Sequence, residues 1–294
     1  MRVGVIDVGA NTVRLLVAAG GPGGIETLHR ERARLGLGEH VEAGGVIPDF
    51  AIEAARRTVR KQAASARRLG CSRVAIVVTS PGRQAGNADE LVASLERTRD
   101  TNVRVLTAEE EAVYAYRGAL SVVDDVPETV GFCDVGGGST QIVVGSRDGE
   151  PDWVRSLDLG SLRLTTRAGL GDPPKRKGIE LARELVRPVF DGVEPPQPEA
   201  ALAAGGSARA VARLVGDRLG PQELAIALRI VAERPSRRFA KTFELSLARA
   251  RTLAAGTLLL ATVQSLLGVP LTVARGGLRE GIALSLFEEE AVAA

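Results

Sequence analysis

The sequence predicts an α/β protein of two lobes, and three observations support this. Strand-like β-branched runs alternate with helical stretches along all 294 residues. A strand–turn–strand unit near the start of the chain occurs again near its middle. Hydrophobic residues make up 45% of the chain and charged residues 25%, which is ordinary for a globular protein, and the length allows one large or two medium domains.

The first half contains a hairpin followed by alternating helices and strands. Val3–Val8 and Val13–Ala18 predict two antiparallel strands around a Gly-Ala-Asn turn. Pro48–Leu69 predicts a helix, because proline stands near its start and Gly70 at its end. The further elements expected in this half are a strand at Val74–Val78, a helix at Asp89–Thr98, a strand at Val103–Leu106 and a helix from Thr107 with an acidic first turn.

The second half begins with another hairpin. The elements expected there are strands at Val130–Val135, Gln141–Gly145, Ala201–Ala204 and Leu271–Ala274, several helices between the last two, and a final helix at Leu278–Glu290. Proline-rich segments at 172–174 and 195–198 predict loops. We place residues 1–124 in an N-terminal lobe and residues 125–294 in a C-terminal lobe, with the option that the last helix packs back on the first lobe.

The repeat is the strongest internal signal. Residues 4–12 align without a gap to residues 131–139, so that Asp7 matches Asp134 and Gly9 matches Gly136. Each unit consists of a strand, an aspartate, a glycine-rich turn, a hydroxyl residue and a second strand. Two β-hairpins that resemble each other by chance are the alternative, but the shared aspartate before the shared turn argues against it.

This pattern suits phosphate chemistry. A tight glycine-rich hairpin can expose consecutive backbone N–H groups to an anion, and hydroxyl groups at Thr12, Ser139 and Thr140 add donors. An aspartate at the end of the preceding strand repels phosphate but can hold Mg²⁺. A third segment, Gly205-Gly206-Ser207, lies between a strand and a helix, where it could face a more distant phosphate or simply join the two elements.

Six segments in order resemble the Ppx/GppA phosphatases, a family of exopolyphosphatases and guanosine pentaphosphate phosphatases. They run over nearly the whole chain and are residues 7–12, 79–87, 109–112, 134–140, 156–165 and 275–281. The chain stops after the final helix, so it resembles the short, two-lobed members. The resemblance implies the two-lobed actin-like (ribonuclease H-like) fold, with duplicated mixed sheets and flanking helices.

The resemblance also implies a function and a set of site residues. The expected activity is Mg²⁺-dependent release of terminal phosphate from inorganic polyphosphate, guanosine pentaphosphate or both, in the cleft between the lobes. Glu111 matches the glutamate that activates water, and Arg83 matches an arginine that contacts the terminal phosphate. Mg²⁺, with Mn²⁺ as an alternative, is expected at Asp134, Asp7 and Gln141. The expected phosphate-binding residues are Gly9, Asn11, Thr12, Gly136, Gly137, Gly138, Ser139, Thr140, Gly205, Gly206 and Ser207.

Three positions depart from the family pattern. Gln141 stands where a glutamate is common, and an amide can coordinate a metal but carries no charge and cannot act as a base. Ala10 replaces a serine, and Pro81 removes one backbone N–H. These changes keep open a weakened paralogue that binds or senses polyphosphate or nucleotide without turnover, and a phosphotransferase of the same fold.

Composition limits the partners and the compartment. The formal net charge of +2 does not indicate a nucleic-acid or membrane partner. Cys71 and Cys133 are expected to be buried, reduced thiols. The longest apolar stretch, Leu253–Val263, is too short to span a bilayer and no secretory leader is recognisable, so we expect a cytoplasmic protein. The resemblance is compatible with a homodimer.

Overall fold

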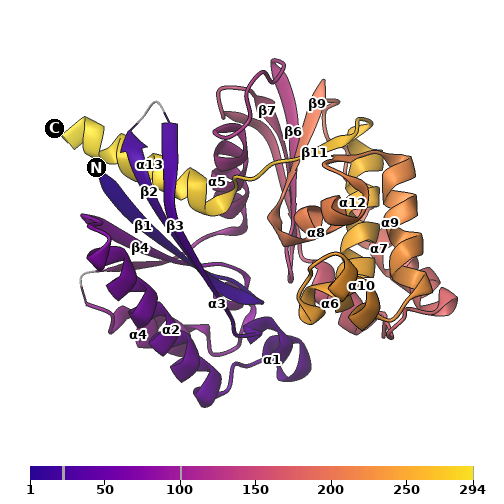
Figure 1. The fold of residues 1–294 in the computed structure, drawn as a ribbon, viewed down its shortest axis with the longest axis horizontal. Helices are drawn as coiled ribbons and strands as arrows, with labels where there is room; N and C mark the ends of the chain where they lie inside the picture. The colour runs from indigo at the N-terminus through magenta and orange to yellow at the C-terminus, as the bar shows by residue number, and fades with distance from the viewer. Residues whose placement is uncertain (22–23, 100, 294) are drawn as a thin grey trace. The chain divides into compact units, whose positions relative to one another are not determined.

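Two compact units make up the chain in the computed structural model, which describes residues 1–21, 24–99 and 101–293 (Figure 1). The first unit comprises Met1–Ser121 together with Gly276–Ala294, and the second comprises Val122–Arg275. The prediction divided the chain at residues 124 and 125 and kept open where the last helix packs. In the structure that helix belongs to the first unit.

A five-stranded sheet forms the centre of the first unit, in the order β3-β2-β1-β4-β5. The strands are β1 (Arg2–Val8), β2 (Thr12–Gly21), β3 (Gly24–Arg34), β4 (Arg73–Val78) and β5 (Asn102–Val105). Successive side chains of β1 alternate between two cores: Ile6 and Val8 pack on one face, and Val3 and Val5 on the other. Both faces of this sheet are therefore covered by apolar side chains.

Helices of the first unit divide between those two faces. The Ile6 face packs against α2 (Asp49–Arg68) and α4 (Ala88–Glu96), and the Val3 face packs against α13 (Leu278–Ala293). The remaining helices of this unit are α1 (Leu37–Gly44), α3 (Ser80–Gln84) and α5 (Ala108–Leu120). A far-separated part of the sequence thus completes the core of the first sheet.

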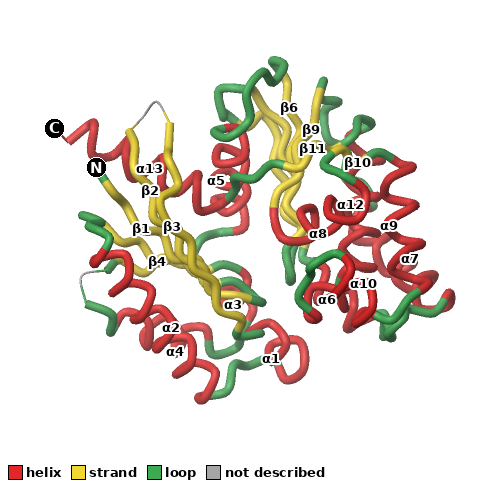
Figure 2. Tube along the Cα trace, in the orientation of Figure 1, coloured by secondary structure: helices red, strands yellow, loops and turns green. Residues whose placement is uncertain are grey.

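A six-stranded sheet forms the centre of the second unit, in the order β10-β11-β9-β6-β7-β8. The strands are β6 (Thr129–Val135), β7 (Thr140–Ser146), β8 (Pro151–Leu157), β9 (Ala200–Ala204), β10 (Arg218–Leu219) and β11 (Leu271–Val273). The helices are α6 (Ser161–Arg167), α7 (Arg176–Phe190), α8 (Gly205–Val215), α9 (Pro221–Glu233), α10 (Ser236–Thr242), α11 (Leu247–Arg251) and α12 (Leu253–Leu267). Helix α12 is the most apolar of them and carries eleven buried residues. Each unit begins with three consecutive strands and continues with helices between the later strands, and Figure 2 shows both kinds of element in each unit.

The two sheets repeat one arrangement. In the first, β1 pairs antiparallel with β2 and parallel with β4. In the second, β6 pairs antiparallel with β7 and parallel with β9. The registers also agree, because Asp7 lies opposite Arg14 and Asp134 lies opposite Gln141. The predicted repeat therefore extends beyond the two hairpins to the parallel strand paired with each of them, β4 and β9.

Helices α5 and α13 approach each other at glycines. A Cβ atom added to Gly118 would lie 2.0 Å from the Gly277 carbonyl oxygen, and one added to Gly281 would lie 1.8 Å from that of Tyr114. No residue larger than glycine fits at either place without separating the helices. This contact fixes α5 against the element that closes the chain.

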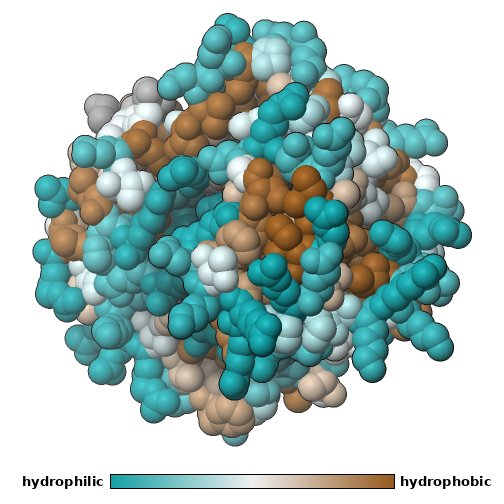
Figure 3. Space-filling view, turned by 45° about the vertical axis from the view of Figure 1, so that its right-hand side comes forward, coloured by the Kyte–Doolittle hydropathy of each residue, from teal (hydrophilic) through white to brown (hydrophobic). Residues whose placement is uncertain are grey.

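Polar side chains predominate on one face of the protein (Figure 3). Hydrophilic side chains cover most of the face shown in Figure 3, with smaller apolar areas between them. Among the described residues, no helix has both the length and the apolar character needed to cross a membrane.

Candidate active site

The two glycine-rich turns have the same backbone geometry. In the first hairpin the Gly9 N–H donates to the Thr12 carbonyl at 3.1 Å. In the second the Gly136 N–H donates to the Ser139 carbonyl at 3.0 Å. These four residues occupy equivalent places in the aligned repeat, so each unit presents one hairpin of the predicted phosphate-binding type.

The hydroxyl groups at these turns have distinct partners. The Thr12 hydroxyl accepts from Arg14 Nε at 2.9 Å, and the Ser139 hydroxyl accepts from Gln141 Nε2 at 2.9 Å. Because both oxygens act as acceptors in these bonds, each hydroxyl keeps its proton for a further acceptor such as a phosphate oxygen. Thr12 and Ser139 therefore suit the predicted role.

Two predicted phosphate ligands have other roles. The fully buried Thr140 hydroxyl donates to the Leu159 carbonyl at 2.6 Å, and the buried Ser207 hydroxyl donates to the Val135 carbonyl at 2.9 Å. Each hydroxyl proton is thus used within the second unit, so we correct the prediction for these two side chains. Sequence shows that a hydroxyl stands at a strand end, but not which way it points.

The predicted catalytic pair lies in contact. Arg83 of α3 donates from Nη2 to Glu111 Oε2 at 2.6 Å and from Nη1 to the Leu106 carbonyl at 2.8 Å. The side chains are 19% and 16% exposed, so solvent reaches the pair but screens it less than a surface pair. The Arg83 guanidinium is therefore fixed by the Glu111 carboxylate and the Leu106 carbonyl, and the two side chains form an ion pair in the first unit.

Local sequence explains where these two side chains lie. A capping box begins α5: the Thr107 hydroxyl accepts from the Glu110 N–H, and the Glu110 carboxylate accepts from the Thr107 N–H. Glu111 is the next residue in this first turn, and its carboxylate contacts Arg83. The short helix α3 starts directly after β4, with Pro81 in its first turn.

The second unit offers oxygen ligands of the kind that Mg²⁺ prefers. Asp134 and Gln141 are cross-strand partners on β6 and β7. Gly205, with a φ of +83°, begins α8 next to them, and a Cβ atom added there would lie 2.0 Å from Asp134 Oδ1. Mg²⁺ usually keeps several waters and takes one or two carboxylates plus substrate phosphates, so one aspartate and one amide fit a hydrated ion.

Asp7 has different surroundings. Arg14 lies opposite it across the hairpin. Burial lowers the pKa of the partly buried Arg279 guanidinium and Arg14 adds to this, whereas Glu280 and Asp7 oppose the shift. Arginines therefore supply positive charge beside Asp7, which makes it the less suitable of the two aspartates predicted to hold a metal.

Several arginines near the turns were not predicted as site residues. Arg14 and Arg279 lie near Asp7, and in the second unit Arg249 Nη1 donates to the Ser207 hydroxyl at 3.2 Å. A Cβ atom added to Gly206 would lie 2.3 Å from Arg249 Nη2, so this guanidinium lies against the start of α8. Arginine is common throughout the chain, so sequence alone offers no reason to select these three.

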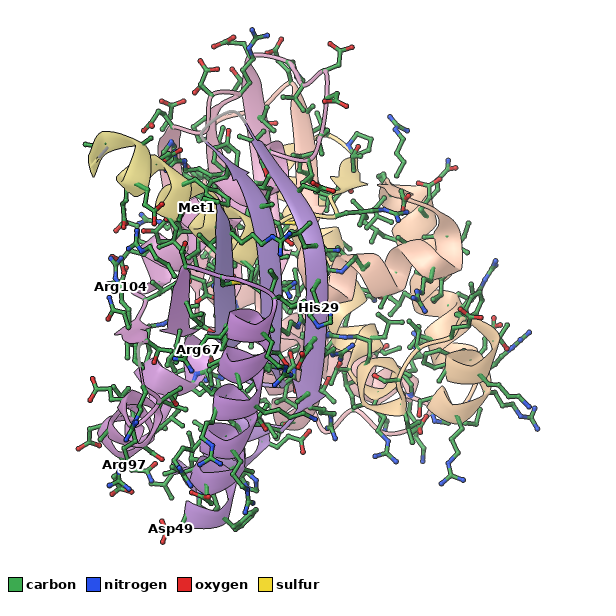
Figure 4. The ribbon with its side chains drawn as sticks, turned by 60° about the vertical axis from the view of Figure 1, so that its left-hand side comes forward. Met1, His29, Asp49, Arg67, Arg97 and Arg104 are labelled. Carbon is green, nitrogen blue, oxygen red and sulfur yellow. The ribbon has the colours of Figure 1, made fainter. Side chains whose placement is uncertain are left out.

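Histidines and cysteines stand apart from these groups. His29, labelled in Figure 4, lies on β3 and contacts Glu31 at 3.2 Å, and His40 meets the Phe50 ring edge-on. Within the part of the chain that the structure describes, no group of three or more His, Cys, Asp or Glu side chains could hold a metal. Cys133 is buried as predicted, but Cys71 is partly exposed because it follows α2 in the loop before β4.

Relatives of known sequence match most of the chain. Exopolyphosphatase 1 of Mycobacterium tuberculosis is 31% identical over 222 residues, which cover 74% of this chain and 64% of that protein. Exopolyphosphatase 2 of the same organism is 34% identical over 198 residues, which cover 63% of this chain and 60% of that protein. The match spans less than two thirds of the length of either relative.

Solved structures agree over almost the full length. The Ppx/GppA family member of Aquifex aeolicus is 27% identical, with a TM-score of 0.84 over 99% of this chain and 98% of that one. An exopolyphosphatase of Cytophaga hutchinsonii, at 22% identity, has a TM-score of 0.87 over 98% of each chain and supports the fold alone. The predicted actin-like fold is confirmed. Because a model of the Ppx/GppA phosphatase family matches residues 16–290, the chain belongs to this family.

Proposed function

We propose that this protein is a phosphohydrolase that removes terminal phosphate from inorganic polyphosphate. The observation that carries the proposal is the Arg83–Glu111 contact at 2.6 Å, in a chain with exopolyphosphatases among its relatives. A carboxylate beside a fixed guanidinium combines the two groups that the reaction needs at the terminal phosphorus. Guanosine pentaphosphate offers the same terminal phosphate and is the second substrate to test.

Hydrolysis then needs little covalent chemistry from the protein. The Glu111 carboxylate takes a proton from a water molecule as the water oxygen bonds to the terminal phosphorus. The bond from that phosphorus to the bridging oxygen breaks, and its electrons remain on the shortened chain. Arg83 donates to the terminal phosphoryl oxygens, where negative charge is spread in the transition state. Thr12 and Ser139 donate their hydroxyl protons to phosphate oxygens of the chain.

A divalent cation fits this proposal. Asp134 and Gln141 would hold Mg²⁺ or Mn²⁺ in the second unit, with Asp7 as the weaker candidate in the first. When bound, such an ion supplies positive charge that offsets the charge of the phosphates. The neutral Gln141 side chain is the specific observation that favours the second candidate function, a protein that binds polyphosphate without turnover.

The test is phosphate release from long-chain polyphosphate, with guanosine pentaphosphate in parallel. Glu111→Gln keeps the shape of the side chain and removes the base, so we expect release to fall about 10²- to 10⁴-fold. Glu109→Gln is the matched control, because Glu109 is an exposed glutamate in the same first turn of α5. Release that is unchanged in Glu111→Gln would contradict the assigned base. Saturable binding by the wild type without release would support the binding function.

Compartment and assembly also belong to the proposal. A cytoplasmic location and a homodimer stay predictions from the sequence and the family resemblance. Size measurement of the purified protein tests the second of these.

A further inference from the structure

The segment that leads into a short helix in each unit holds the glycine-rich turn of that unit by its carbonyl oxygens. In the second unit the N–H groups of Ser161 and Leu162 donate to the Gly136 and Gly137 carbonyls, both at 2.9 Å. The Arg163 N–H adds a bond to the Gly137 carbonyl at 3.1 Å, and the Ser161 hydroxyl adds one to the Gly136 carbonyl at 2.9 Å. Four donors at the start of α6 thus hold two consecutive peptide groups.

Because the peptide bond is planar, a contact that fixes a carbonyl group also fixes the direction of the following N–H group. In a trans peptide the C=O and the following N–H point in opposite directions. The only cis peptide among the described residues is Asp172–Pro173, so both peptides of the turn are trans. When α6 fixes the carbonyls of Gly136 and Gly137, it also aims the N–H groups of Gly137 and Gly138 away from itself. Two adjacent N–H groups that point the same way form an anion site.

The first unit repeats the arrangement. The Gly38 N–H donates to the Ala10 carbonyl at 2.8 Å. The N–H groups of Leu35 and Gly36 donate to the Asn11 carbonyl at 3.1 and 3.2 Å. By the same peptide geometry, the N–H groups of Asn11 and Thr12 point away from α1. Ala10 aligns with Gly137 in the repeat, so this carbonyl is held in both units, whereas the second held carbonyl is Asn11 in the first unit and Gly136 in the second.

Glycine is required where the helix meets the turn. A Cβ atom added to Gly160 would lie 2.5 Å from the Gly137 carbonyl carbon and oxygen and 2.6 Å from the Gly138 nitrogen. One added to Gly38 would lie 2.8 Å from the Ala10 Cβ. The atoms around Gly160 are backbone and cannot rotate away, so the turn itself would have to move. The buried Arg163 side chain pairs with Asp158, which adds an ion pair to this segment.

We propose that the segments 160–163 and 36–38 are positioning elements that hold the two phosphate-binding turns with their N–H groups aimed at the ligand. This inference rests on the proposed function, because it assigns the ligand as a phosphate chain. The positioning residues lie outside the turns themselves: they are Gly160 and Ser161 in the second unit, and Gly38 in the first. None of them touches the phosphate.

The experiment measures binding of tripolyphosphate by calorimetry, together with KM and kcat for polyphosphate and the thermal midpoint of each variant. Gly160→Ala displaces the turn, so we expect Kd and KM to rise roughly 10- to 100-fold, the value of one or two charge-assisted hydrogen bonds. Ser161→Ala removes one of the two bonds to Gly136 and should give a smaller rise.

The controls are Gly171→Ala and Gly44→Ala, because an added Cβ meets nothing closer than 3.7 Å at either position. Gly38→Ala tests the first unit in the same way.

A purely structural role would lower the thermal midpoint without a selective rise in KM. Amide NMR of the wild type separates these cases, since tripolyphosphate should shift the Gly137 and Gly138 resonances. Unshifted resonances, or Ser161→Ala and Gly160→Ala variants that bind as tightly as the wild type, would overturn the inference. Wild type that binds tripolyphosphate through these amides but releases no phosphate would instead overturn the hydrolase and leave the inference standing.

Discussion

Replacing Gln141 by glutamate should make the stability of the second unit depend on a divalent cation. Gln141 is 2% exposed and lies directly across the hairpin from Asp134. Side chains of cross-strand partners are about 5 Å apart. At that distance two carboxylates repel by about 3 kcal/mol at an effective dielectric constant of about 20. We expect Gln141→Glu to lose this much free energy of unfolding at neutral pH without metal, with a further cost for burying the charge.

Two conditions should reverse that loss. Mg²⁺ that binds only the folded state at about 100 times its Kd adds about 2.7 kcal/mol, nearly the whole repulsion. Lower pH should also help: repulsion raises the folded-state pKa of the carboxyl pair above its unfolded value. The destabilisation is therefore present above that folded pKa and is relieved as the pH falls through it.

Thermal unfolding with EDTA or Mg²⁺, at neutral and mildly acidic pH, measures both effects. A change of about 3 kcal/mol corresponds to a shift of roughly 6–12 °C for a unit of this size. Gln264→Glu is the matched control, because Gln264 is a buried glutamine of α12 in the same unit, 7% exposed. That variant should lose stability without recovery by Mg²⁺. A Gln141→Glu variant that is as stable as the wild type in EDTA, or that ignores Mg²⁺, would refute the reasoning.

Two further predictions concern packing and thiol chemistry. Gly281→Ala should destabilise the first unit by about 3 kcal/mol or more, because the new Cβ would lie 1.8 Å from the Tyr114 carbonyl oxygen and α5 would have to move away from α13. Chemical denaturation checks this, and a variant that unfolds like Gly44→Ala would contradict the contact. Burial raises the pKa of the Cys133 thiol, so this residue should resist a thiol reagent at neutral pH until the protein unfolds. Burial also raises the pKa of the partly exposed Cys71, which should react slowly but before Cys133, and mass spectrometry identifies the order.

The sequence predicted the strands that carry an apolar pattern and did not predict those that lack one. The third strand of the first unit, β3, carries charged residues along most of its length and is largely exposed, as an edge strand can be. It therefore resembles a polar loop until β2 is placed beside it. The short helices α1 and α6, each at most eight residues long, have too few turns to show a period.

The sequence also predicted single site residues but not the contacts between them. Glu111 and Arg83 were predicted from their motifs, but their contact joins α5 and α3, with the two residues 28 positions apart, and no spacing rule connects them. The carbonyl bonds from α6 to Gly136 and Gly137 are backbone contacts, and any residue but proline can donate them. The glycine at position 160 is the one feature of this contact that is visible in the sequence. Glycine is also common before helices where no other group approaches it closely, so it does not identify the contact.

Duplication makes the difference between the two hairpins informative. The scaffold is the same in both, down to the aspartate, the turn bond and the segment that holds the turn. The cross-strand partner of the aspartate differs: it is Arg14 in the first unit and Gln141 in the second. An arginine brings a permanent cation to the first turn, where Arg279 interacts with Asp7 as well. The amide brings none to the second turn, so a phosphate bound there gains more from an added ion. We therefore expect the proposed cation to bind at Asp134, and Asp134→Asn to weaken the proposed Mg²⁺ dependence more than Asp7→Asn does.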